Sequence, residues 1–258
     1  MIYLLALVGA FFAGCINTLA GNGSAITLTL LTDVLGLPPV VANATNRVGV
    51  AAQCGVSTRQ FYRSGLLDLA NSRHVVVFTV IGALAGIYVA GIIDNASFRA
   101  IFRYLLLAML VVILVRPSRW LRRAAAEDVT PKLPAWVSTP LFLALGFYGG
   151  FIQMGMGVFF LAATVLLARY DIIRANALKS AVVGIYTLIA VIYYAAIGLI
   201  HWPLGLLLAV GQMGGAYLTA RFATQNDQAA LWAYRLLVVV IIGAIVKVFW
   251  PEISGWWG

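Results

Sequence analysis

The chain contains the stretch Ala42-Asn43-Ala44-Thr45-Asn46-Arg47, and a related stretch, Ala175-Asn176-Ala177-Leu178-Lys179-Ser180, lies 133 positions later. Three further pairs of segments repeat at nearly the same offset: residues 65–68 with 198–201, 82–83 with 215–216 and, after a one-residue gap, 21–23 with 155–157. Both halves of the chain therefore descend from one pattern. Two related halves in a mostly apolar chain, each with glycine-interrupted segments, are typical of secondary transporters.

The composition places the chain in a lipid bilayer. Its 258 residues are 63% hydrophobic and only 10% charged, with a mean hydropathy of +0.99. Soluble domains are nearer half apolar and a quarter charged, so one water-exposed fold cannot hide this much apolar surface. The net charge of +9 comes from basic residues at the ends of apolar segments and in one polar connector. That placement is typical of membrane topology, and we expect no nucleic-acid partner.

Apolar runs between polar, proline or glycine breaks predict about ten helical segments. They cover residues 2–19, 24–37, 41–58, 74–93, 98–115, 138–153, 157–169, 175–198, 203–220 and 229–250. The second and seventh are too short to cross a hydrocarbon core of ~30 Å. The sequence thus predicts an all-α, polytopic membrane protein with a first transmembrane repeat at 1–115, a basic cytoplasmic connector at 116–137 and a second transmembrane repeat at 138–258.

The basic residues predict which side each loop faces. If the segments alternate in direction, one set of loops, which includes the connector, holds eleven arginines and lysines, and the opposite set holds only Arg99. The positive-inside rule puts the first set in the cytoplasm and both termini outside. Equivalent loops also differ: residues 59–73 carry three arginines and 199–203 none, whereas 38–41 carry none and 169–174 carry two. We therefore expect two inverted repeats of about five segments each.

A first group of polar and glycine residues interrupts the apolar pattern at equivalent places in both repeats. Its members are Asn17, Gly21, Asn22, Gly23 and Ser24 in the first repeat and Gln153, Gly155 and Gly157 in the second. Glycines permit a helix break, and a new helix beginning near Ser24 would direct free N–H groups towards an anion. Tight helix packing is the alternative explanation for the glycines. The amides of Asn17, Asn22 and Gln153 favour a binding site, because polar side chains inside a bilayer are costly.

A second group opens the helices that follow. Its members are Asn43, Thr45, Asn46, Arg47 and Gln53 in the first repeat and Asn176, Lys179 and Ser180 in the second. Asn46 and Lys179 are equivalent positions, and amide donors beside two cations suit an oxyanion that accepts several hydrogen bonds. The alternative is that Arg47 and Lys179 extend from near helix ends to the membrane interface. Their placement beside asparagines in both repeats favours the binding site.

Other chemistry has little support in the sequence. His74 and His201 lie at segment ends without the clustered ligands that a metal needs, so we expect neither a metal nor a cofactor. Ser24 has no histidine within the membrane to activate it, and we expect no enzyme. Asp33 is a carboxylate inside a short segment, which leaves proton coupling open.

The chain resembles the TauE/SafE family of sulfite exporters over nearly its full length. The resemblance rests on residues 14–65, above all 17–24 and 42–48, and on residues 150–155 and 174–179 of the second half. It implies a carrier for a small anion such as sulfite or an organosulfonate, surrounded by the lipids of the bacterial inner membrane. A homodimer is left open.

Export is the expected direction, because an inside-negative potential of 100 mV expels an anion with ~2.3 kcal/mol per charge. Two alternatives stay open: a proton-coupled importer of a small carboxylate, and a membrane scaffold that transports nothing.

Overall fold

The computed structural model describes residues 2–93, 133–226, 228–236 and 238–239, and within these ranges every regular element is a helix. The elements are α1 (Ile2–Leu19), α2 (Ser24–Thr29), η1 (Leu30–Val34), α3 (Pro39–Arg63), α4 (Arg73–Ile92), α7 (Ala135–Phe151), α8 (Met156–Leu161), η2 (Ala162–Leu167), α9 (Ile172–Ala196) and α10 (Trp202–Gln225). Residues 229–236 are also helical. The elements η1 and η2 are π-helical turns that continue α2 and α8.

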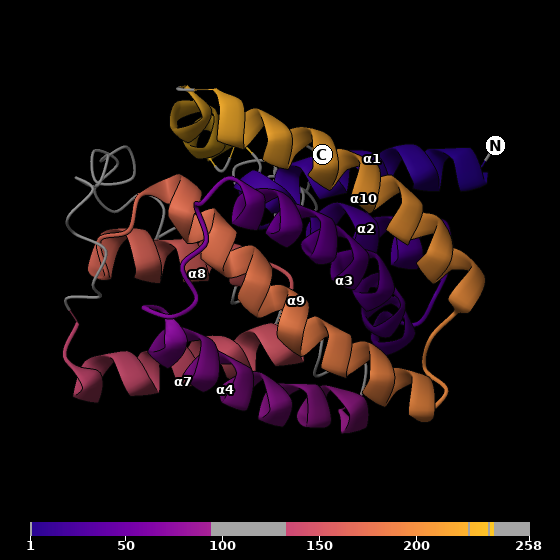
Figure 1. Cartoon of the computed structure of the whole chain (residues 1–258). Coiled ribbons are helices and arrows are strands. Elements are labelled where there is room, and N and C mark those ends of the chain that lie inside the picture. Colours follow the sequence, from indigo (N-terminus) through magenta and orange to yellow (C-terminus); the bar gives the residue numbers. More distant parts are fainter. Residues whose placement is uncertain (1, 94–132, 227, 237, 240–258) are drawn as a thin grey trace, which may run out of the picture.

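The helices form three layers, with α3 and α9 in the middle (Figure 1). On one side α1 and α10 pack along each other, and on the other side α4 packs along α7. The middle helix α3 contacts both α9 and α10. Each outer pair therefore joins the first helix of one repeat to the fourth helix of the other.

The order of elements repeats in the two halves of the chain. A long helix, a six-residue helix with a π-helical extension, a 25-residue helix and a further long helix occur in each half. The backbone repeats too, because left-handed φ angles occur at equivalent positions: Gly21 (79°) and Gly155 (78°), Gly36 (70°) and Arg169 (63°), Gly65 (67°) and Gly198 (70°). The duplication seen in the sequence thus extends to the turns. The inverted orientation of the two halves stays a prediction.

Among the described residues, four helices are long and apolar enough to cross a membrane: α1, α4, α9 and α10. Helix α3 has 25 residues, enough for ~37 Å of helix, but a more polar composition. Its polar residues from Asn43 to Arg47 are buried in the middle layer, away from the lipid-facing surface. Such a helix is tolerated in a bilayer because its neighbours shield it. The all-α, polytopic membrane architecture is confirmed.

Several helix ends differ from the sequence-based boundaries. Helix α9 begins at Ile172 rather than at residue 175, because the Asp171 carboxylate accepts hydrogen bonds from the N–H groups of Ile173 and Arg174, both at 2.9 Å. Helix α3 continues to Arg63, five residues beyond its expected end; its last turn buries Phe61, while Tyr62 and Arg63 are exposed. Residues 98–115, most of the connector at 116–137 and the end of the segment 229–250 lie outside the described residues.

Candidate functional site

Helical structure is interrupted after α1, at residues 20–23, and after α7, at residues 152–155. These two non-helical segments, called the breaks, lie against each other. Gly21 has a φ of 79°, and a Cβ placed on it would lie 2.6 Å from the carbonyl carbon of Gly157. A Cβ on Gly157 would in turn lie 2.4 Å from the Cα of Gly21. Only glycine permits this close approach of two backbones. The breaks therefore cross at a point where segments from both halves touch.

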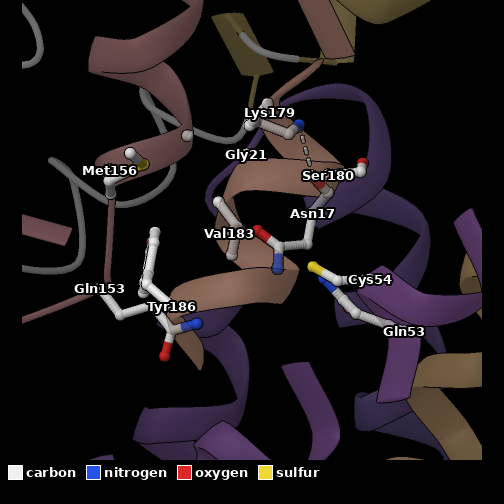
Figure 2. A pocket seen from close by; sticks show the side chains of 11 residues that line it. Asn17, Gly21, Gln53, Cys54, Gln153, Met156, Lys179, Ser180, Val183 and Tyr186 are labelled. Atoms are coloured by element: carbon white, nitrogen blue, oxygen red, sulfur yellow. Dashed lines mark hydrogen bonds between the residues drawn. The ribbon is translucent and has the colours of Figure 1, made fainter. Parts of the chain in front are cut away.

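A cavity of about 20 Å³ lies beside this crossing, with walls from both halves of the chain (Figure 2). Its lining consists of Asn17, Gly21, Gln53, Cys54, Gln153, Met156, Gly157, Lys179, Ser180, Val183 and Tyr186. The space is about that of one water molecule. In this conformation the cavity is therefore too small for an anion of four or more heavy atoms.

Three polar atoms of the lining residues are buried and lack a hydrogen-bond partner: Gln53 Oε1, Gln153 Oε1 and the Tyr186 hydroxyl. Gln153 also has a φ of 62°, unusual for a residue with a side chain, and its Nε2 lies 3.4 Å from Thr187 Oγ1. Unpartnered buried polar groups are costly unless a ligand or water satisfies them. Strained backbone and unpaired groups together are typical of a binding site.

Lys179 is the cation on the cavity wall. Its side chain is 3% exposed, and Nζ donates to the carbonyl oxygens of Asn17 (2.8 Å) and Thr18 (3.1 Å) and to Asn176 Oδ1 (2.5 Å). Figure 2 shows the lysine above Asn17 with the bond to that residue dashed. Three accepting oxygens match the three N–H bonds of a charged ammonium group. All three donors of a charged Lys179 are therefore occupied beside the cavity.

Arg47 makes the corresponding contact in the other half, but it does not line the cavity. Its Nη1 donates to the carbonyl of Gly149 at 3.2 Å and its Nη2 to that of Gly150 at 2.5 Å, near the end of α7. The guanidinium lies 5.8 Å from the centre of the Tyr194 ring, and the side chain is fully buried. The expectation that Arg47 contacts the anion directly has no support in this geometry.

The asparagines beside the two cations bind the last residue of the opposite first helix. Asn43 Nδ2 donates to the Phe151 carbonyl at 3.3 Å, and Asn176 Nδ2 donates to the Leu19 carbonyl at 3.0 Å. Carbonyls at a helix C-terminus have no partner within the helix. We therefore place Asn43 and Asn176 in the support of the breaks, with Asn176 also contacting Lys179.

The remaining predicted residues do not line the cavity. Asn46 Oδ1 accepts from Thr27 Oγ1 (2.7 Å) and Gln212 Nε2 (3.2 Å), and its Nδ2 has no partner. Thr45 Oγ1 accepts from the His201 N–H at 3.0 Å. Also outside the lining are Asn22, Gly23, Ser24 and Gly155, of which Asn22 is fully buried with both side-chain polar atoms unpartnered.

Of the sixteen predicted site residues, the cavity brings together Asn17, Gly21, Gln53, Gln153, Gly157, Lys179 and Ser180. Four lining residues were not predicted from the sequence: Cys54, Met156, Val183 and Tyr186. Each lies in an apolar run, where a thiol, an aliphatic side chain or an aromatic ring looks like ordinary core. Their spacing offered a weak signal, since positions 179, 183 and 186 share one face of α9.

The groups considered for other chemistry lie elsewhere. His74 Nε2 is 2.9 Å from Ser138 Oγ and 3.2 Å from Thr139 Oγ1, so this histidine joins α4 to α7. Asp33 is exposed on η1, away from the cavity lining. In the described part of the chain, no three His, Cys, Asp or Glu side chains gather as a metal site would require.

Several apolar helices around a closed polar cavity at the meeting point of two broken segments define a multi-pass membrane transporter. The sequence model of the family "Sulfite exporter TauE/SafE" matches residues 6–248. The chain belongs to this family of membrane transporters.

Relatives in several bacteria are similar to the chain over most of their length. A probable membrane transporter protein, ORF9, of Sinorhizobium sp. is 29% identical over 95% of this chain and 92% of its own length. A probable membrane transporter protein of Haemophilus influenzae is 26% identical over 93% and 91%. The probable membrane transporter protein YfcA of Escherichia coli K12 is 23% identical over 92% and 85%. No solved structure matches the chain.

Proposed function

We propose that the protein exports a small oxyanion, sulfite or an organosulfonate, across the bacterial inner membrane by alternating access. The observation that carries this proposal is the cavity between the two breaks, where the Lys179 ammonium group stands beside the unpartnered Tyr186 hydroxyl and several polar side chains. An anion there gains charge attraction, and the hydroxyls of the lining can donate to its oxygens. The unpartnered Oε1 atoms of Gln53 and Gln153 only accept, so these carboxamides would have to turn their NH2 groups towards the anion to donate to it. The family name points to the same substrate class.

The volume of the cavity supports a closed state of the transport cycle. About 20 Å³ accommodates one water but not a four-atom oxyanion, so substrate entry requires the breaks to separate. Gly21 and Gly157 touch through their backbones, and a small change of φ and ψ at these residues would open the space.

Export is favoured over uptake by the placement of carboxylates. Among the described residues these are Asp33, Asp68 and Asp171, and none of them lines the cavity. Proton-coupled uptake of an anion generally uses a carboxylate within the membrane. An anion leaving the cell needs no such group, because the membrane potential drives it outwards.

The test is efflux from proteoliposomes that contain the full-length protein, under an imposed potential of either sign. Sulfite, methanesulfonate and acetate are loaded in parallel, and we expect potential-dependent efflux of sulfite or the sulfonate. Flux of acetate alone, or uptake that needs a proton gradient, would replace the exporter with the carboxylate importer. No flux of any anion from folded protein would favour the scaffold.

A pair of variants tests whether Gln153 belongs to the binding site. Gln153→Leu removes an amide from the cavity, and its loss of flux should exceed that of Gln225→Leu, at an exposed position near the end of α10. Thermal unfolding of both variants controls for misfolding. Equal flux in the two variants would remove Gln153 from the site.

A further inference from the structure

Within the described part of the chain, the buried cations have no buried carboxylate to balance them. Arg47 and Lys179 are the two charged side chains that the interior holds within the described residues. The carboxylates in this part of the chain are Asp33 and Asp68, both exposed, and Asp171, which is half-buried and lies 3.4 Å from the exterior Arg174. The core therefore carries two positive charges that are held by neutral oxygens.

The partial charges of the helix ends do not remove this excess. The C-termini of α1 and α7, which the two cations contact, carry about half a negative charge each. The helical segments Ser24–Val34 and Met156–Leu167 begin only a few residues later and bring about half a positive charge each to the same breaks. These contributions cancel, and the two full charges of the side chains remain.

Both charges act on the cavity. Lys179 stands on its wall. Arg47 donates to the carbonyl of Gly149, and a Cβ at Gly149 would lie 2.6 Å from Met156 Cγ and 2.9 Å from the Tyr186 hydroxyl, both on lining residues. The guanidinium is therefore one residue behind the wall. Because little water separates them, each cation attracts an anion in the cavity more strongly than it would in solution.

We propose that the cavity selects divalent over monovalent oxyanions, because a dianion neutralises both buried cations and a monoanion leaves one uncompensated. This inference rests on the proposed function and adds the charge of the substrate to it. The hydrogen-bonding groups of the cavity recognise oxygens of either kind of anion. The two cations discriminate by charge, because the donors of Lys179 are occupied by protein oxygens and Arg47 lies behind the wall.

Sulfate and methanesulfonate are a matched pair of probes, since both are tetrahedral and similar in size but differ by one charge. Binding of each to the full-length protein in nanodiscs is measured by isothermal titration calorimetry at neutral pH. We expect sulfate to bind at least about tenfold more tightly than methanesulfonate. The same preference should appear when the two anions compete with sulfite in proteoliposome efflux.

Gln53→Glu tests the charge argument with little change of shape. Gln53 is 3% exposed, lines the cavity and has an unpartnered Oε1, so a glutamate there adds one negative charge beside Lys179. We expect the preference for sulfate to disappear, with methanesulfonate binding at least as well. Gln225→Glu makes the same change at an exposed position and should keep the preference. Thermal unfolding checks that both variants are folded.

The possible results distinguish the charge selection from the anion transport on which it rests. Equal binding of both anions to the unmodified protein, or a sulfate preference that survives Gln53→Glu in folded protein, overturns the charge selection and leaves an anion carrier. Binding of neither anion, together with no efflux of sulfite, overturns both. A sulfate preference that Gln53→Glu abolishes and Gln225→Glu keeps supports the proposal.

Discussion

Arg47 and Lys179 make the same kind of contact in the two halves of the molecule, but in different surroundings. Each cation lies on the third helix of its repeat and donates to carbonyls at the end of the first helix of the other repeat. Arg47 is enclosed by protein behind the cavity, whereas Lys179 forms part of the cavity wall. The comparison teaches that one contact only holds helices of the two repeats together, whereas its counterpart also faces the cavity.

The largest effect on stability is expected from Arg47→Met. The change leaves the carbonyls of Gly149 and Gly150 without these donors in a fully buried place, and each lost partner costs about 1–3 kcal/mol. We expect the variant to unfold at a clearly lower temperature or to fail to accumulate as folded protein. Thermal unfolding in detergent with size-exclusion chromatography measures this. Arg47→Lys is the matched control, and it should recover part of the loss.

The largest effect on transport is expected from Lys179→Met. The carbonyls of Asn17 and Thr18 lose a donor too, but they lie beside a cavity that a water molecule can occupy. Stability should therefore fall less than in Arg47→Met. Loss of a full charge close to the substrate costs ~3 kcal/mol, or roughly a hundredfold in flux. Efflux and thermal unfolding are measured on the same preparations.

Exchanging Asn46 and Lys179, which occupy equivalent positions in the two repeats, tests whether the charge must lie on the cavity wall. The double variant Asn46→Lys with Lys179→Asn keeps the composition but moves the charge to the position that contacts Thr27 and Gln212. We expect this double variant to lose transport. If it transports as well as the unmodified protein, a charge at position 46 serves transport as well as one at position 179, and the special role assigned to Lys179 is wrong.

A smaller effect is expected at Cys54, a cavity residue that the sequence placed in ordinary core. Cys54→Ala should keep flux within about threefold, since removal of a small apolar side chain changes little charge or hydrogen bonding. Alkylation of the thiol with N-ethylmaleimide should instead block efflux, because the adduct fills the space. Cys15→Ala removes the other cysteine, and the Cys15→Ala/Cys54→Ala variant is the control. Full transport after complete alkylation of Cys54 would contradict the cavity assignment.

The smallest effect concerns Asp68, whose equivalent in the second half is His201. The backbone N–H and side-chain amide of Asn71 lower the pKa of the Asp68 carboxyl below its ordinary value. Its contribution to stability is therefore present above that ordinary pKa and is lost as the pH falls through the lowered value. Asp68→Asn should narrow the difference between the unfolding temperatures at pH 6 and pH 3 slightly. If the difference between the two unfolding temperatures is unchanged, the hydrogen bonds between Asp68 and Asn71 do not contribute to the pH dependence of stability.

The fold could be predicted well from the sequence because hydropathy and glycine placement act locally. The breaks near Gly21 and Gly155 and the short helices after them are visible in the order of residues. Helix ends were less accurate where a cap decides them, as Asp171 does for α9. That carboxylate was one polar residue among several at the end of a segment.

The site was predicted only in part, because the sequence does not show in which direction a side chain points. Sequence spacing identifies Arg47 and Lys179 as costly residues within the membrane, but it does not say which carbonyls their side chains reach. Those partners come from helices of the opposite repeat, more than a hundred positions away. Tyr186 was missed because a tyrosine in an apolar helix has the pattern of core, and only packing around Gly149 brings its hydroxyl to the cavity.

The contact between Gly21 and Gly157 has a consequence for the evolution of the chain. After a duplication, the two halves of a gene are free to diverge wherever their products meet separate neighbours. At this crossing each backbone is the neighbour of the other, and a methyl group on either side would collide with the opposite chain. The collision is with backbone, so it arises whatever residue the opposite copy carries, and neither copy can diverge at this point while the crossing is kept.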